Sequence, residues 1–176
     1  ILIKGLSLRH SDTPTLRHHE THTTMRQMIL WLLLAIPAAA SPDVTVVESP
    51  EDYARLVADD AVVLVEFYSK YCGSCKEFSK HWHALEDTFA GKLKLARVKI
   101  DDSGPMKVAQ TAGALNGGIP HVRLLTATDD SSIVLMNGGS GIKKSRVLTE
   151  EINQKLKTFD VSSEGTWLKK AVGTEL

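Results

Sequence analysis

The fold is decided by residues 62–76, which read VVLVEFYSKYCGSCK. An apolar run typical of a buried strand leads directly into Cys72 and Cys75, the only two cysteines of the chain. At a strand-to-helix junction, this spacing lets one sulfur attack a disulfide while the other resolves the mixed disulfide. An inert structural pair is the alternative. A disulfide stabilises according to the loop that it closes, and this loop is minimal, which favours a working redox pair.

Composition narrows the class of protein. The chain has 176 residues, of which 43% are hydrophobic and 24% charged, and this fits one globular domain with extensions. Its formal net charge is zero, so nothing in the charge balance indicates a nucleic-acid partner or an anionic membrane surface. Two cysteines also exclude a disulfide scaffold.

Residues 25–40, MRQMILWLLLAIPAAA, have the three parts of a secretory signal. A basic start, an apolar core and small residues predict a signal peptide that is cleaved after Ala40. The apolar core is shorter than the ~20 residues that span a bilayer, so we expect no membrane segment in the mature chain. An uncleaved anchor or a buried helix is the alternative. Residues 1–24 are expected to be a non-native or disordered upstream extension.

Alternating patterns predict strands and helices along the rest of the chain. Residues 41–159 form one predicted domain, and residues 160–176 form a loose polar tail. The expected order is βαβαβ, then α, ββ and α, which predicts an α/β fold with a mixed sheet and helices on both faces. The predicted strands are residues 44–47, 61–68, 93–100, 120–126 and 132–136. The predicted helices start at Ser49, at the cysteines, near Ser103, and at Ser145 or Thr149.

The chemistry follows from the position of each residue. Cys72 would lie at a helix N-terminus, where free N–H groups and the dipole stabilise a thiolate, and is the predicted nucleophile. Cys75, one turn further and less exposed, would resolve the mixed disulfide. Glu66 is a charge inside an apolar strand, so burial should raise its pKa and let it exchange a proton with Cys75. A Glu66 that faces solvent at an edge is the alternative.

A zinc site is the rival interpretation of the cysteines. Cys72, Cys75, His81 and His83 are close in sequence. On a helix, however, His81 and His83 would be about 200° apart around the axis, so they cannot both face the cysteines. We therefore expect no metal and no organic cofactor.

Taken together, these residues resemble the thioredoxin fold, and within it the catalytic domains of protein disulfide isomerases. The resemblance rests on residues 65–68, on the Cys-Gly-x-Cys-Lys motif at residues 72–76, and on the aromatic Trp82. A further motif, Ile119-Pro120, is similar to the cis-proline loop of that fold. The resemblance covers about residues 43–158.

The chain departs from the pattern of these relatives at four points. Gly73-Ser74 stands where isomerases usually have Gly-His and thioredoxin has Gly-Pro, and Tyr71 replaces the usual Trp. Lys80 occupies the position of a helix-kinking proline, and His121 replaces the Thr after the cis-proline. These changes leave the redox potential and substrate preference open, but not the reaction type.

The resemblance also implies roles for single residues. Arg97 aligns roughly with a lysine that partners the buried acid, although a surface charge is equally consistent with its position. A cis bond before Pro120 would place the backbone of Ile119 beside Cys72, where it can pair with an extended peptide. Tyr71, Gly73 and Ser74 complete the predicted substrate site.

The sequence leaves more than one role for two of the side chains in this region. Ser74 could donate a hydrogen bond to the Cys72 thiolate or act as a small spacer. His121 could contact substrate or contribute a proton, and solvation is the interpretation that we prefer.

The expected function is a thiol–disulfide oxidoreductase of the protein disulfide isomerase type, in the endoplasmic reticulum lumen or secreted. Its substrates would be cysteine-containing proteins, an upstream oxidase or glutathione would reset the pair, and the chain would be monomeric. Two alternatives stay open. One is a redox-silent peptide-binding or chaperone module, and the other is a secreted thioredoxin-type reductase for a dedicated partner.

Overall fold

A computed structural model describes residues 42–128 and 131–170, which contain one five-stranded sheet. The strand order is β1-β3-β2-β4-β5. Strands β1, β3 and β2 are parallel, whereas β4 is antiparallel to both β2 and β5. The strands are β1 (Val44–Val47), β2 (Val63–Tyr68), β3 (Lys94–Lys99), β4 (His121–Leu125) and β5 (Ser132–Met136).

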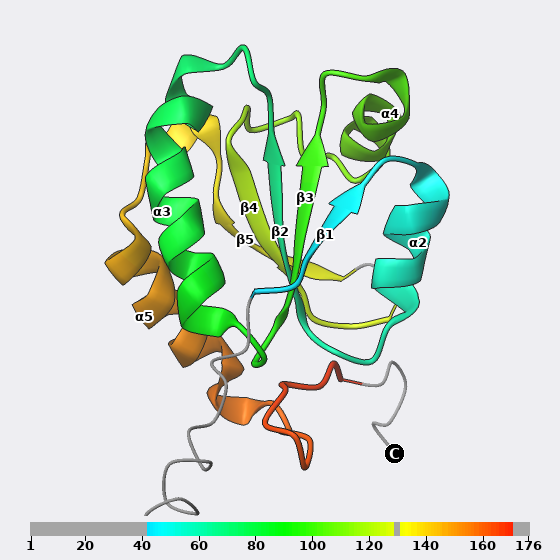
Figure 1. Cartoon of the computed structure of the whole chain (residues 1–176), viewed down its shortest axis with the longest axis vertical. Helices are drawn as coiled ribbons and strands as arrows, with labels where there is room; N and C mark the ends of the chain where they lie inside the picture. Colours follow the sequence, from blue (N-terminus) through cyan, green and yellow to red (C-terminus); the bar gives the residue numbers. More distant parts are fainter. Residues whose placement is uncertain (1–41, 129–130, 171–176) are drawn as a thin grey trace, which may run out of the picture. The chain divides into compact units, whose positions relative to one another are not determined.

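Helices cover both faces of this sheet (Figure 1). One face carries α3 (Gly73–Phe89) and α5 (Ser145–Lys155), and the other carries α2 (Pro50–Ala58) and α4 (Ser103–Thr111). Short 3₁₀ helices span Gly138–Ser140 and Leu156–Thr158. The mixed sheet and its two helical layers confirm the fold class predicted from the sequence.

The helix starts follow from local capping. Ser49 Oγ accepts from the Asp52 N–H at 3.1 Å, and the Asp52 carboxylate accepts from the Ser49 N–H at 2.9 Å. This reciprocal capping box, with Pro50 in the first turn, fixes the start of α2. The cap of α3 is Cys72 itself, whose sulfur accepts from the Cys75 N–H at 3.1 Å. The Cys72–Cys75 pair therefore also forms the N-terminal cap of the helix.

Strand β2 is buried on both faces, as its continuous apolar sequence predicts. Leu64 faces α3 and α5, while Val65 and Phe67 face α2 and α4. Helix α3 contributes four buried side chains at helical spacing, and each such burial is worth roughly 1.5–3 kcal/mol. These four are Phe78, Trp82, Leu85 and Phe89. The sheet and α3 thus hold the cysteines on a rigid base.

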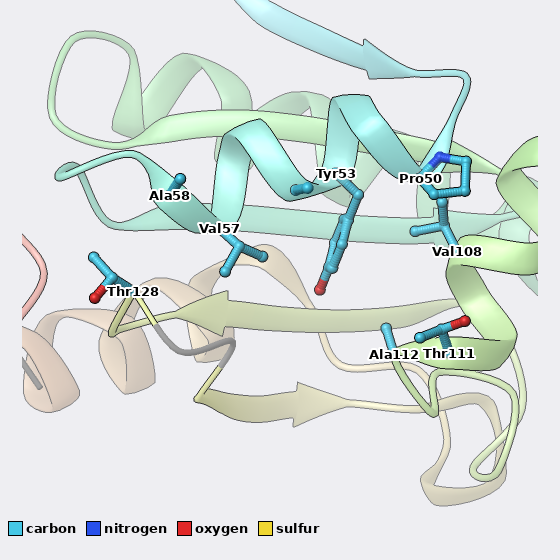
Figure 2. Close-up of a pocket in the computed structure, with 9 residues that line it drawn as sticks. Pro50, Tyr53, Val57, Ala58, Val108, Thr111, Ala112 and Thr128 are labelled. Atoms are coloured by element: carbon cyan, nitrogen blue, oxygen red, sulfur yellow. The ribbon is translucent and has the colours of Figure 1, made fainter.

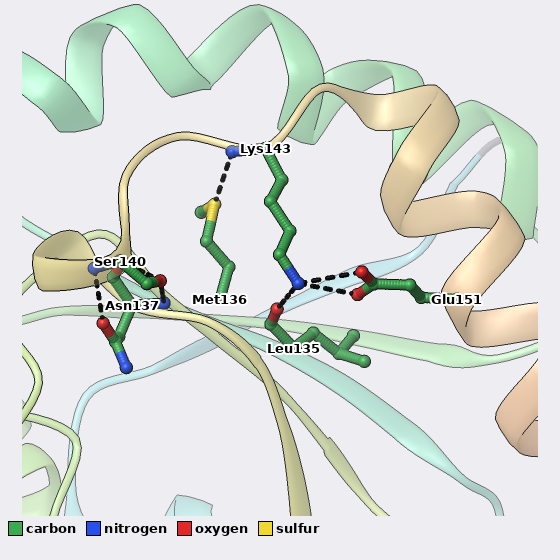
Figure 3. Close-up of polar contacts among 6 residues, drawn as sticks. All are labelled: Leu135, Met136, Asn137, Ser140, Lys143 and Glu151. Atoms are coloured by element: carbon green, nitrogen blue, oxygen red, sulfur yellow. Dashed lines mark hydrogen bonds and ion pairs between the residues drawn. The ribbon is translucent and has the colours of Figure 1, made fainter.

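Polar contacts fix the connection from β5 to α5 (Figure 3). The Lys143 ammonium donates to the Leu135 carbonyl at 2.7 Å and to both carboxylate oxygens of Glu151 at 2.9 Å. Asn137 and Ser140 form a capping box, with the Ser140 N–H donating to Asn137 Oδ1 at 2.9 Å. The connection is thus held at both of its ends.

The end of the described chain differs from expectation. We predicted that residues 160–176 form a loose tail, but residues 160–170 are hydrogen-bonded to the domain. Trp167 donates its N–H to the Lys92 carbonyl at 3.0 Å and accepts from the Val62 N–H at 2.9 Å. Its ring lies 6.5 Å from that of Phe89. The Lys169 ammonium donates to the last carbonyls of α2, at Leu56 and Val57.

Several sequence predictions lie outside the described residues. These are the upstream extension at 1–24, the signal peptide at 25–40, and the last six residues of the chain. Within residues 42–128 and 131–170, no helix has the length and apolarity needed to cross a membrane.

The packing of the tail predicts a stability change. Trp167→Ala removes the ring that packs on Phe89, and we expect the free energy of unfolding to fall by about 1–3 kcal/mol. Urea denaturation measures this change. Val161→Ala alters an exposed side chain of the same segment and serves as the control. A Trp167→Ala protein as stable as the wild type would contradict the assignment of the tail to the domain.

Candidate active site

Cys72 and Cys75 form a disulfide at the N-terminus of α3, with Cα atoms 5.2 Å apart. Cys72 is half-buried, whereas Cys75 is 4% exposed, so the first sulfur is the accessible one. The Cys75 N–H points at the Cys72 sulfur, and it would donate to a thiolate there. With the helix dipole, this geometry favours the charged form of Cys72 after reduction.

Asp101 anchors the loop that precedes Cys72. Its carboxylate accepts from the Ser69 hydroxyl and, at 3.1 Å, from the Lys70 N–H. Ser69 in turn accepts from the Tyr71 N–H at 3.1 Å and from the Cys72 N–H, through its carbonyl, at 3.3 Å. The hydrogen bond from Ser69 is the main reason that the pKa of Asp101 is lowered.

Sequence analysis did not identify this role of Asp101. The signal was nonetheless present, because Asp101 follows β3 just as Ser69 follows β2. Parallel neighbours end at the same edge of a sheet, so acidic and hydroxyl residues that follow them come together there.

The Ile119–Pro120 bond is cis, as predicted, and its loop lies beside the cysteines. The Ile119 carbonyl oxygen is 3.9 Å from Cys72 Sγ. Ser74 Oγ lies near both groups, 3.1 Å from Cys72 Sγ and 3.4 Å from the Ile119 oxygen. The structure therefore brings the predicted nucleophile, Ser74 and the predicted peptide-pairing backbone into one cluster.

The loop before Pro120 rests on the 3₁₀ turn that follows β5. Gly138 donates its N–H to the Gly118 carbonyl at 3.0 Å, and Gly139 donates to Gly117 at 2.8 Å. A Cβ at Gly138 would collide with the Ile119 carbonyl, so only glycine fits this approach. The capping contacts of Asn137 and Ser140 in Figure 3 hold this 3₁₀ turn in place, and the turn supports the loop before Pro120.

Glu66 is fully buried on β2, under α3, as expected from its apolar surroundings. Arg97 lies opposite it on β3 and donates Nε–H to Glu66 Oε2 at 2.8 Å. Burial raises the pKa of Glu66 to about 7, and the Arg97 guanidinium limits that rise. Such a group can hold or release a proton near neutral pH.

Arg97 is a partner of Glu66 and not a simple surface charge. Its guanidinium lies 4.2 Å from the centre of the Tyr68 ring and 5.9 Å from that of Trp82. A pocket of about 230 Å³ is lined by Arg97, Tyr68 and Cys75, among others. Glu66 Oε1 accepts no hydrogen bond from the described residues. The acid thus has one oxygen without a hydrogen bond, and its partner Arg97 lines a pocket that includes Cys75.

A second buried acid, Glu86, was missed in the sequence. Its carboxylate accepts from the Trp82 indole N–H and lies 2.6 Å from His83 Nδ1. Its charge also raises the pKa of Glu66, after the larger effects of burial and Arg97. The sequence signal was that Glu86 follows His83 by three residues and Trp82 by four, which brings these side chains together on one side of α3.

The preferred interpretation of His121 as a solvated side chain was wrong. His121 is 3% exposed, and its ring packs edge-on to Phe67 with centroids 5.8 Å apart. Its Nε2 accepts from Arg123 Nε at 3.2 Å. Burial, with the nearby Arg123 charge, lowers the pKa of His121 to about 4, so the imidazole is neutral at physiological pH. Strand β4 is covered on both faces, and this is why the histidine is enclosed.

The remaining predicted substrate-site residues lie at the surface. Tyr71 is 77% exposed, and the Lys70 ammonium lies 4.8 Å from its ring centre. Gly73 begins α3, and no heavy atom lies within 4 Å of the position a Cβ would take there. The side of the disulfide next to these residues is open to a peptide.

The opposite face carries a separate apolar pocket between α2 and α4 (Figure 2). It has a volume of about 400 Å³ and includes Tyr53 and Val57 from α2 and Val108 from α4. Its described lining contains neither cysteine.

Comparison with known proteins places the chain in one family. A family model described as Thioredoxin matches residues 44–154, which is more than half of the chain. The chain is 36% identical over 84 residues to the protein disulfide-isomerase A6 homolog of Drosophila melanogaster. That match covers 44% of this chain and 19% of the relative.

A second relative matches over most of its own length. The chain is 27% identical over 97 residues to a thioredoxin of Bacillus subtilis, covering 55% of this chain and 85% of that protein. By contrast, the chain spans only 19% and 21% of the length of two disulfide isomerases that it matches.

Solved structures agree on the fold. A thioredoxin mutant from Halobacterium salinarum superposes with a TM-score of 0.51 at 19% identity, over 66% of this chain and 94% of the other. The J-Trx1 fragment of ERdj5 gives 0.53 at 16% identity, over 65% and 52%.

Burial of His121 predicts a pH-dependent stability. Because its folded pKa of about 4 is below the ordinary value of 6.5, the unfolded chain takes up the proton first as the pH falls. We expect the wild type to lose about 3 kcal/mol of unfolding free energy relative to His121→Gln between pH 7 and pH 4.

Urea denaturation at several pH values tests this, since the difference between the two proteins isolates His121. His81→Gln, on α3, is the control and should track the wild type. A constant difference between wild type and His121→Gln would show that His121 does not titrate in this range.

Proposed function

The chain belongs to the thioredoxin family of thiol–disulfide oxidoreductases, and from that premise we propose that it exchanges disulfides with cysteine-containing proteins of the secretory pathway. In this proposal it acts in the manner of a protein disulfide isomerase domain. The reactive pair is Cys72 and Cys75, and neither a metal nor an organic cofactor takes part.

One observation carries the proposal. The accessible sulfur of a closed disulfide lies at a helix N-terminus, 3.9 Å from the Ile119 carbonyl of the cis-proline loop. A client peptide that pairs with this backbone would present its own sulfur to Cys72. Geometry of this kind brings the two sulfurs together before exchange.

The exchange proceeds in two steps when the pair is reduced. The Cys72 thiolate attacks one sulfur of a client disulfide, which forms a mixed disulfide and releases the other client sulfur as a thiolate. Cys75 then gives its proton to Glu66 and attacks Cys72 Sγ. This step closes the Cys72–Cys75 bond, releases the second client thiolate, and transfers two electrons to the client. The reverse sequence oxidises a client dithiol.

Glu66 supports the proton step of this mechanism. Its pKa of about 7 makes the carboxylate able to accept the Cys75 proton and to release it again at neutral pH. Arg97 keeps the charged form accessible, because without its hydrogen bond burial alone would raise the pKa of Glu66 further.

The secretory assignment rests on the predicted signal at residues 25–40 and on similarity to disulfide isomerases. An oxidising compartment would keep the pair closed between turnovers. Expression of the full chain in a eukaryotic cell, followed by fractionation, tests this part. Recovery in the cytosol with residues 25–40 intact would contradict it.

A second candidate is a thioredoxin-type reductase for a dedicated partner, which the similarity to the Bacillus subtilis thioredoxin favours. The equilibrium potential of the pair against glutathione separates the two. A value near −270 mV favours the reductase, and one near −180 mV favours the isomerase.

Cysteine variants test the exchange. In an insulin-reduction assay, Cys72→Ser should have no activity above background, because the nucleophile is gone. Cys75→Ser should instead accumulate a mixed disulfide with the client, since the resolving thiol is missing. Non-reducing gels measure that species. If Cys72→Ser retained full client binding and the wild type showed no turnover, the domain would be a redox-silent binding module.

Removal of the buried acid should slow the resolving step. We expect Glu66→Gln to resolve a pre-formed mixed disulfide at least ~10-fold more slowly at pH 7, with a smaller deficit above about pH 9, where the thiol ionises unaided. Stopped-flow release of a labelled client thiol gives the rate. Glu77→Gln, on the exposed side of α3, is the matched control. A Glu66→Gln deficit that is independent of pH would contradict a proton-transfer role.

A further inference from the structure

Ser74 lies between two groups that the reaction uses differently. Its Oγ is 3.1 Å from Cys72 Sγ and 3.4 Å from the Ile119 carbonyl oxygen. Because Cys72 is in a disulfide, its sulfur carries no proton, so the Ser74 hydroxyl is the donor to both acceptors. The hydroxyl proton is thus shared between the reactive sulfur and the backbone expected to receive a client.

The strength of one of these acceptors depends on the redox state. A disulfide sulfur is uncharged and a weak acceptor, whereas a thiolate is charged, and hydrogen bonds to charged groups are the stronger ones. Two reduced thiols, such as those of glutathione, break the Cys72–Cys75 bond and themselves join as a disulfide. This leaves Cys75 as a thiol and Cys72 as a thiolate, and the second thiol proton goes to solvent. The Ser74 donor is then drawn toward Cys72.

The other acceptor is the one that a peptide needs. An extended client pairs through its N–H groups with backbone carbonyls, and Ile119 offers its carbonyl next to the reactive sulfur. While Ser74 donates to that oxygen, part of its accepting capacity is taken. A client N–H therefore competes with the hydroxyl for this oxygen in the oxidised state.

We propose that Ser74 is a redox-linked gate on client binding. In the disulfide form it caps the Ile119 carbonyl, and in the dithiol form it turns to the Cys72 thiolate and leaves that carbonyl to the client. The proposal rests on the proposed exchange function and adds a preference to it. The reduced protein binds extended peptides more tightly than the oxidised protein, and product release follows closure of the Cys72–Cys75 bond.

Thermodynamic linkage between peptide binding and the redox state of the pair determines which reaction the gate favours. If a peptide binds the dithiol form more tightly, then by reciprocity the peptide shifts the equilibrium of the pair toward that form. A protein that engages clients mainly when reduced attacks client disulfides in preference to making them. The gate therefore favours reduction and isomerisation over net oxidation.

Peptide titration in both redox states tests the gate. The probe is an insulin B chain with alkylated cysteines, and amide NMR of the protein measures dissociation constants even when binding is weak. We expect the wild type to bind the probe roughly three- to tenfold more tightly when reduced, the range that one net hydrogen bond provides. Ser74→Ala should bring this ratio close to one, by tightening binding to the oxidised form. Ser74→Thr retains the hydroxyl and should restore the ratio.

A second readout follows the other acceptor. Thiolate absorbance against pH gives the pKa of Cys72 in the reduced protein, and Ser74→Ala should raise that pKa by roughly one unit, a tenfold loss of ionisation. Ser145→Ala changes a serine in the first turn of another helix, α5, and should alter neither quantity.

The outcomes separate the gate from the exchange function. Equal binding ratios in wild type and Ser74→Ala overturn the gate, and so does the absence of binding in both redox states. If insulin reduction by the wild type continues in either case, the exchange function stands without the gate. If the wild type neither cycles nor reduces insulin, the proposed function itself is wrong.

Discussion

The parallel pairing of β2 with β3 is the constraint on which the site depends. Their register places Glu66 opposite Arg97, so that a buried carboxylate meets its guanidinium partner inside the sheet. The same register ends both strands at one edge, where Ser69 meets Asp101 and fixes the backbone just before Cys72. A shift by one residue would turn Glu66 to the other face of the sheet, away from α3. The acid, its partner and the loop are therefore set by a single alignment.

The two faces of the sheet hold buried groups that respond to pH in opposite senses. Glu66, under α3, has a raised pKa, so its effect on stability becomes less favourable as the pH rises from about 4.5 to 7. His121, on the other face, has a lowered pKa, so its effect becomes less favourable as the pH falls from about 6.5 to 4. The two dependences overlap and largely offset each other. The combined contribution of these two residues to stability thus varies less with pH than that of either one alone.

The sequence predicted the elements because their signals are local. Continuous apolar strands, the Ser49 cap and the helical spacing of aromatic residues each depend on near neighbours, and the structure confirms them. The prediction of a solvated His121 was wrong because its enclosure depends on the layers that cover both faces of β4 and on the contact with Phe67, which is distant in the sequence. The prediction of a loose tail at residues 160–176 was wrong for a similar reason. Its mostly polar composition gave no indication that Trp167 packs on the domain. The partners of Trp167, which are Val62 and Lys92, lie far away in the sequence. Catalytic roles at the cysteines came from their spacing and from their expected place at a helix N-terminus, and their chemistry stays a prediction.

The last described segment also bears on how the domain is made. Lys169 hydrogen-bonds to carbonyls at the end of α2, and Trp167 pairs with the backbone around β2 and β3. A nascent chain grows from its N-terminus, so these partners emerge from the ribosome between 75 and 113 residues before Trp167 and Lys169 do. Until then, the Val62 N–H and the last carbonyls of α2 lack the partners that they have in the folded domain. Completion of this domain therefore waits until residues 167–169 have been synthesised.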